Sequence, residues 1–383
     1  MATAIRALDP RTALAATTIA RTATADALAV DGLLPDGLDG SFLQAGPHPI
    51  GRFGSGPHHV RGIRLSGGAA QWYRAETPVR RSEPLRPLPA LAPSVWLGDA
   101  DDATSDEPGA AAIARPVREA GSANWHTVAT YPGLGYAEHL VAAPDGTLVA
   151  AEAFALDGAP LIEAVAVTPR FLVVLDQPLV FSRAAALVGA RLPYVWRDEH
   201  GARVGLLPRG GGEPRWFPVE PCHVTHVVNA YDDGDRVVLD TIRARGPYRW
   251  TFDLTSGTVH GVALPGVPEH AIVDERVSGR RHRHVFGRRG HAELVHHDLA
   301  DGTSRTGDLG AGWRMGDPVF APDPRSDAEG GGWLLFVARN PSHGRHELRV
   351  HDALRPEAPP RAVVRLPVPL PDGWRTVWMP SAS

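Results

Sequence analysis

Short runs of β-branched and other apolar residues, separated by polar turns, fill most of the chain after residue 126. Runs such as FLVVLD, RVVLDTIR, YRWTFDL and WLLFVAR have the length and composition of β-strands. Turn sequences such as PDG, LDG, DDGD and TSG recur between them. Strands that recur in four-stranded units of roughly 40–50 residues predict an all-β propeller.

One predicted hairpin in this region carries cysteine and histidine residues within an otherwise apolar strand. Residues 214–243 contain two apolar limbs joined by the turn sequence DDGD, and the first limb carries Cys222, His223 and His226. Side chains alternate across a strand, so Cys222 and His226 are expected on one face and His223 on the other. A buried histidine needs a partner, which a metal ion, a carboxylate or a backbone carbonyl would provide.

The part of the chain before residue 126 has a different amino-acid composition. Residues 1–35 are rich in Ala and Thr and predict an N-terminal arm, which leaves 36–383 as a single propeller domain. Residues 82–118 are rich in Pro, Ala and Asp, and this composition predicts a long surface loop, because proline removes ladder donors. Its apolar part, residues 87–97, is the one segment suited to weak contact with a membrane surface or to covering an entrance.

Charge and cysteine content narrow the function classes. The formal net charge is −4, which does not favour a nucleic-acid partner, and one cysteine excludes a disulfide framework. No run of eighteen apolar residues predicts a transmembrane helix. The N-terminus lacks a continuous apolar segment, so we expect an unprocessed cytoplasmic protein.

Several stretches, in the same order, resemble the carotenoid cleavage oxygenase family, which includes lignostilbene dioxygenases. They are LDGSFLQAGPHP, GSANWHTV, PCHVTHVVNAYDDGDRVVLD, EHAIVDERVSGRRHRHVF, GDPVFAPDP and PLPDGWRTVWMP. The resemblance implies a seven-bladed β-propeller, here with short top-face loops. It also implies a non-heme Fe(II) dioxygenase, in which four histidines hold the iron on the axis and glutamates orient them. Such an enzyme cleaves a C=C bond of an apolar conjugated substrate with O2.

Carried over residue by residue, the resemblance covers only part of that iron site. His226 matches a family histidine, and Glu269 matches a glutamate that orients the ligands. Asp317 stands where the family has another such glutamate. For the first histidine the resemblance offers two alignments: His139 as the ligand, or Glu138 as an orienting carboxylate.

Two ligand positions depart from the family pattern. Glu163 stands where the family has its second histidine, and Arg375 stands where it has its fourth. One outcome is a reduced iron site made by His226, His139 and Glu163. A second is a metal-free pocket in which Glu163 pairs with Arg375 and both take part in catalysis.

Three functions follow from these arrangements. The leading expectation is oxidative, dioxygenase-type C=C cleavage of an apolar conjugated or aromatic substrate in an axial pocket with a reduced iron site. The alternative is a metal-independent isomerase or cyclase that uses the same pocket. The third is a non-catalytic propeller that only binds its ligand, since a fold does not imply a function.

Overall fold

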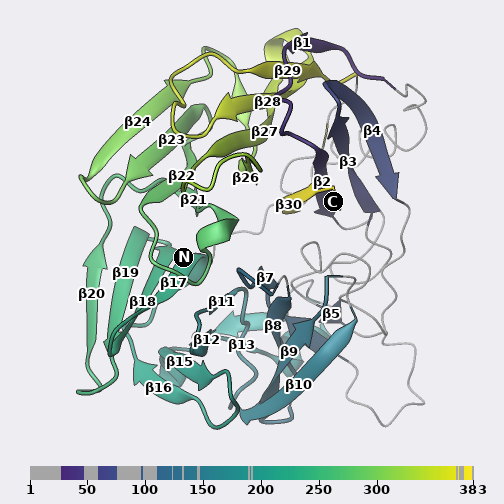
Figure 1. Cartoon of the computed structure of the whole chain (residues 1–383). Coiled ribbons are helices and arrows are strands. Elements are labelled where there is room, and N and C mark those ends of the chain that lie inside the picture. The colour runs from purple at the N-terminus through teal and green to yellow at the C-terminus, as the bar shows by residue number, and fades with distance from the viewer. Residues whose placement is uncertain are drawn as a thin grey trace.

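A computed structural model describes residues 27–46, 59–75, 96–97, 110–122, 124–131, 133–144, 147–188, 190, 193–367, 370 and 375–381. Within these residues the strands form seven antiparallel sheets, of which six are arranged as a ring around a common centre and the seventh is a hairpin inserted within one of them (Figure 1). The number of sheets agrees with the seven blades that were expected, although one of the seven sheets is a two-stranded hairpin. The all-β propeller is therefore confirmed.

The first half of the ring contains three large sheets. The sheet that joins the two ends of the described chain consists of β2 (Gly40–Gly46), β3 (His59–Ser66), β4 (Ala69–Ala75) and β30 (Arg375–Pro380). The second consists of β5 (Trp96–Leu97), β6 (Ala110–Ile113), β7 (Val117–Arg118), β8 (Trp125–Thr130), β9 (Tyr136–Ala142) and β10 (Leu148–Ala155). The third consists of β11 (Val165–Val167), β12 (Phe171–Asp176), β15 (Arg203–Pro208) and β16 (Arg215–Pro218).

A small insertion lies between β12 and β15. It contains the hairpin β13 (Leu179–Phe181) and β14 (Tyr194–Trp196), the helix α2 (Arg183–Leu187) and the 3-10 helix η2 (Asp198–His200). Among the described residues, no helix is long and apolar enough to cross a membrane.

Three further sheets complete the ring. One consists of β17 (Val224–Asp233), β18 (Arg236–Arg243), β19 (Gly246–Asp253) and β20 (Val259–Ala263). The next consists of β21 (His270–Ile272), β22 (His284–Arg289), β23 (Glu293–Asp298) and β24 (Thr303–Asp308), with the 3-10 helix η3 (Glu275–Val277) after β21. The last consists of β25 (Arg314–Met315), β26 (Val319–Pro322), β27 (Gly332–Asn340), β28 (Arg345–Asp352), β29 (Ala362–Arg365) and β1 (Val30–Gly32), with η4 (Pro341–His343) between β27 and β28.

The hairpin expected in residues 214–243 forms as β17 and β18. Asp233 pairs with Arg236, and Gly234 takes a left-handed φ of 60° in the turn, which glycine adopts without strain. The register shifts between Val224 and His226. An extra residue at that point interrupts the alternation of side chains, so the expected shared face is not maintained along the whole limb.

One expectation from composition was wrong. Residues 82–118 do not form only a surface loop, because β5, β6 and β7 lie within them. Ala112, Ile113 and Ala114 are buried, at most 2% exposed. Most of residues 87–97, the proposed membrane-contacting segment, lie outside the described residues.

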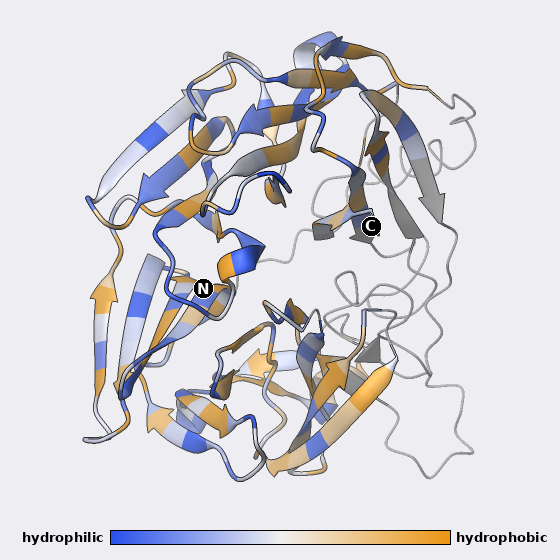
Figure 2. Cartoon of the chain, in the orientation of Figure 1, coloured by the Kyte–Doolittle hydropathy of each residue, from blue (hydrophilic) through white to orange (hydrophobic). Residues whose placement is uncertain are grey.

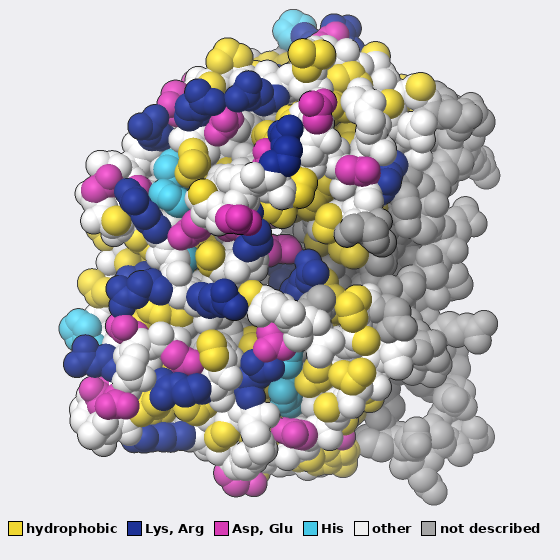
Figure 3. All heavy atoms as spheres, viewed as in Figure 1, with side chains coloured by type: hydrophobic (Ala, Val, Ile, Leu, Met, Phe, Trp, Pro, Cys, Tyr) yellow, Lys and Arg dark blue, Asp and Glu magenta, His cyan; other side chains and the backbone are white. Residues whose placement is uncertain are grey.

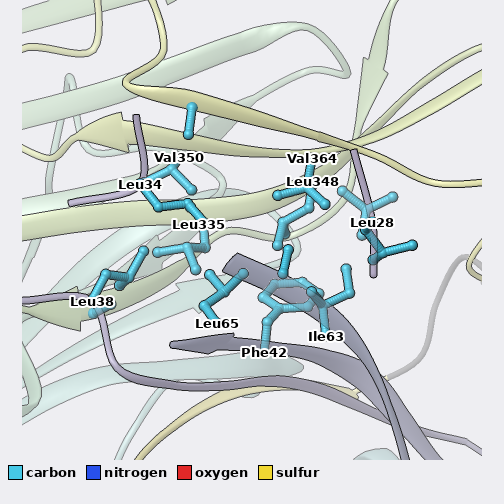
Figure 4. Close-up of a cluster of buried hydrophobic side chains, with 14 of the residues drawn as sticks. Leu28, Leu34, Leu38, Phe42, Ile63, Leu65, Leu335, Leu348, Val350 and Val364 are labelled. Atoms are coloured by element: carbon cyan, nitrogen blue, oxygen red, sulfur yellow. The ribbon is translucent and has the colours of Figure 1, made fainter. Parts of the chain in front are cut away.

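The ring is closed by two sets of strand pairs between distant parts of the chain. β2 pairs with β30, and β1, from the segment expected to be an arm, pairs with β29. Side chains of these two sheets point toward one another in a common core that includes Phe42, Ile63 and Val364 (Figure 4). Hydrophobic and hydrophilic residues alternate in bands along many strands (Figure 2), as sheets that bury selected side chains require.

Trimming this closing core should cost a small, measurable amount of stability. Ile63 is fully buried, and removing one methylene from it in Ile63→Val should lower the free energy of unfolding by about 0.5–1.5 kcal/mol. Val149 is 55% exposed, and Val149→Ala should stay within about 0.5 kcal/mol of the wild type. Denaturant unfolding of the two variants measures the difference, and equal midpoints would contradict the packing described here.

Candidate active site

Polar side chains from five sheets meet near the centre of the ring. The segment before β7 lies beside the segment before β11, because Arg115 and Ala164 form a parallel bridge. The N–H of Arg115 donates to the carbonyl oxygen of Glu163 at 2.8 Å. We call the side chains connected around this point the axial cluster: Arg115, Glu163, His223, His226, His270, Arg288 and Asp317.

His226 has both ring nitrogens engaged. Its Nε2 lies 2.8 Å from the carbonyl oxygen of Ala271 on β21. A carbonyl only accepts, so Nε2 carries the proton and Nδ1 presents a lone pair. Nδ1 lies 3.5 Å from Nη1 of Arg115, which donates toward it. Burial, together with the charge of Arg115, lowers the pKa of His226 to about 4, so the ring is neutral.

Glu163 and His223 form an acid–imidazole pair on one side of the cluster. His223 precedes β17, and its Nε2 lies 3.3 Å from Oε2 of Glu163. Both side chains are about one-third exposed. The hydrogen bond to Glu163 raises the pKa of His223, and burial opposes that effect. The pair therefore favours a proton on the imidazole of His223.

Asp317 forms a second charged group in the cluster. It accepts from Nε of Arg288 at 2.8 Å and lies 3.2 Å from Nδ1 of His270. Asp317 is 53% exposed, so these contacts are partly screened by solvent. Burial is the largest influence on His270 and lowers its pKa.

Both charged groups act on Arg115. Its side chain is exposed, yet the surrounding protein lowers its pKa, which Asp317 and Glu163 act to raise. Figure 3 shows a hollow near the middle of this face, with cationic and carboxylate side chains around it.

Two of the other residues implied by the resemblance, His139 and Glu138, contact side chains other than His226. His139 stacks on His126, with ring centroids 5.2 Å apart, and its Nε2 lies 3.0 Å from Nδ1 of His126. Glu138 accepts a hydrogen bond from the hydroxyl of Tyr131. Glu269 is exposed at the start of β21. For Arg375 only the backbone is described, and it pairs with Ala45, so its expected contact with Glu163 lies outside the described side chains.

These residues do not fit a histidine-held iron centre as they stand. His226, His139 and Glu163 do not come together, and the described part of the chain contains no group of three His, Cys, Asp or Glu side chains able to hold a metal ion. Nε2 of His226 is bonded to a carbonyl, and a permanent cation lies beside its other nitrogen.

Arg115 was missed from the sequence. It precedes a proline in a stretch whose composition predicted a loop, and no motif around it indicates a function. Its contact with His226 joins residues 111 positions apart. His223 had been assigned only to the opposite face of its strand, and the structure places it before the strand, against Glu163.

The fold and the site define an all-β propeller with a charged axial centre. A model of the family described as retinal pigment epithelial membrane protein (RPE65) matches residues 103–380. The chain therefore belongs to the carotenoid cleavage oxygenase/RPE65 family, as a distant member.

Named relatives agree with this membership. The carotenoid cleavage oxygenase of Mycobacterium tuberculosis is 25% identical over 463 residues, covering 90% of this chain and 92% of that protein. The apocarotenoid-15,15'-oxygenase of Synechocystis is 25% identical over 269 residues, covering 60% of this chain and 55% of that protein.

Two solved structures share the fold. The lignostilbene dioxygenase of Pseudomonas brassicacearum superposes with a TM-score of 0.74 at 21% identity, covering 94% of this chain and 97% of that one. Cobalt-substituted Synechocystis apocarotenoid oxygenase gives a TM-score of 0.76 at 19% identity, covering 98% and 100%.

Proposed function

We propose that this chain is a metal-independent isomerase or cyclase that acts on an apolar conjugated or aromatic substrate at the axial cluster. The observation that carries the proposal is the state of His226. Its Nε2 donates to the carbonyl of Ala271, and its Nδ1 faces the guanidinium of Arg115. A histidine bonded in this way supports a cationic site rather than a metal ligand set.

The cluster supplies the parts that acid–base chemistry needs. Arg115 offers positive charge and N–H donors to an oxygen atom of the substrate. His223, held by Glu163, gives a proton to one carbon of the conjugated system and takes a proton from another. One proton is added and one is removed, so the product is an isomer of the substrate, and the step requires no oxidant.

Oxidative cleavage with a reduced iron site is the second candidate. Its support is the similarity to the carotenoid cleavage oxygenase of Mycobacterium tuberculosis along 90% of the chain. It would require His226 to turn away from Ala271 and to meet further ligands, for which His139 and Glu163 were the expected ones.

Metal analysis separates the two candidates. Protein purified from iron-replete cells should contain far less than one iron per chain, and His226→Ala should not change that content. His260→Ala, at an exposed position on β20, is the matched control. One iron per chain, lost in His226→Ala and kept in His260→Ala, would overturn the metal-free proposal.

The acid–base role of Glu163 gives a kinetic prediction. Glu163→Gln keeps the size of the side chain and removes its charge, so kcat should fall by about 10²–10⁴-fold with a smaller change in KM. The assay follows conversion of polyene and stilbene compounds to isomers under argon. Binding of these compounds without turnover by the wild type would instead indicate a binding propeller.

A further inference from the structure

Arg115 has no counter-ion among the described residues. A guanidinium has five N–H donors, and the side chain of Arg115 makes one long contact, at 3.5 Å, with a neutral imidazole nitrogen. The nearest carboxylates already have other partners. Asp317 is bound by Arg288 and His270, and Glu163 is bound by His223.

The charge of Arg115 is not neutralised by a neighbouring carboxylate. Desolvation lowers the pKa of its guanidinium and Asp317 and Glu163 act to raise it, but among the described residues neither carboxylate forms an ion pair with it. The side chain nevertheless remains accessible to solvent. A solvent-accessible guanidinium that forms no ion pair with the described residues can bind an anionic ligand.

The chemistry of the guanidinium narrows the class of that anion. Its planar fork matches the two oxygens of a carboxylate and forms paired, charge-assisted hydrogen bonds with them. Glu163 and Asp317 repel a further negative charge, but each is itself held by a cationic or imidazole partner. One singly charged carboxylate therefore suits the site better than a multiply charged phosphate.

We propose that Arg115 anchors a carboxylate of the substrate, so that the substrate class is an apolar conjugated or aromatic acid. The inference rests on the proposed function, because the acid anchored at Arg115 is the molecule that His223 and Glu163 would transform. The anchor sets the position of the conjugated chain relative to His223. Arg115 acts in this way as a specificity-determining residue.

Calorimetric titration with matched acids and esters tests the anchor. The probes are cinnamate, stilbene-4-carboxylate and retinoate, each beside its methyl ester. At least one acid should bind the wild type ten-fold or more tightly than its ester. Arg115→Gln should abolish that preference, and Arg115→Lys should keep part of it, because lysine retains the charge without the fork. Arg245→Gln, at a side chain 84% exposed, should keep the wild-type preference.

Each outcome decides between the two proposals. Equal binding of acid and ester by the wild type, an unchanged preference in Arg115→Gln, or no binding of any acid at millimolar concentration would overturn the anchor. If Arg115→Gln does not fold, the wild-type ratio and the Arg115→Lys ratio decide. Preferred binding of an acid without turnover would support the anchor and overturn the enzyme. Turnover of an ester alone would support the enzyme and overturn the anchor.

Discussion

Acidification from pH 7 to pH 5 should lower the free energy of unfolding by about 2 kcal/mol for each of three buried histidines, His139, His296 and His351. Each of them is at most 6% exposed. Burial is the main cause that lowers the pKa of all three to about 4. Nearby charge adds to it, from His126 for the first, His284 for the second and Arg349 for the third.

The direction follows from proton binding in the two states. An unfolded histidine titrates near about 6.5, so between that pH and about 4 the unfolded chain binds protons that the folded chain refuses. Stability contributed by these neutral rings is fully present above pH 6.5 and is lost as the pH falls through this window. Measurements above pH 5 keep the effect separate from protonation of carboxylates.

One substitution isolates a single histidine. His351 stacks on Phe336, with ring centroids 5.4 Å apart, and its two buried nitrogens have no hydrogen-bond partner within the described part of the chain. His351→Phe should therefore keep or raise the midpoint of thermal unfolding at pH 7 and reduce its fall at pH 5. His260→Phe, at an exposed position, should follow the wild type. A His351→Phe variant with the wild-type pH slope would contradict the explanation.

Removal of the carboxylate of Asp274 should destabilise the protein by about 3–5 kcal/mol. Asp274 is fully buried and precedes η3. It accepts from Nη2 of Arg276 at 2.7 Å and from the N–H of Gly330 at 3.1 Å. Arg276 also donates to the carbonyl oxygens of Ala328 and Gly331, both at 3.0 Å. Asp274→Ala would break this junction between two neighbouring sheets and leave the guanidinium without its carboxylate.

Two comparisons test the source of the loss. Asp274→Asn keeps an oxygen acceptor and removes the charge, so its cost should be smaller than that of Asp274→Ala. Asp323 forms a similar pair with Arg325, at 3.1 Å, but this arginine is 61% exposed. Asp323→Ala should therefore cost about 1 kcal/mol or less. Denaturant unfolding measures all three, and equal costs at Asp274 and Asp323 would contradict the role of burial.

Local pattern was sufficient for most of the strands. RVVLDTIR coincides with β18 and FLVVLD with β12, because β-branched runs bounded by turn residues specify a strand without help from distant contacts. The same reasoning failed for residues 110–118. Ala and Pro there carry no strand signal, and β6 and β7 form because they pair with β8.

The candidate site, too, could be predicted only in part from the sequence. His226 could be singled out because a histidine in an apolar strand needs a partner, and its family resemblance was visible. The partner could not be predicted. A backbone carbonyl, a carboxylate or a metal ion can each serve as the partner of the ring, and the selection of Ala271 depends on how β17 and β21 approach each other. Arg115 arrives beside it from a third sheet.

By itself the sequence determined the all-β class, the hairpin around DDGD and the family to which the chain belongs. The spacing of apolar residues, the residue types in turns and the order of motifs can all be read along the chain without knowledge of distant contacts. Only the tertiary structure decided which side chains share the axis. The ring brings residues 115, 163, 226 and 317 together from separate sheets. Their charges then act on one another through short distances that no spacing along the chain encodes.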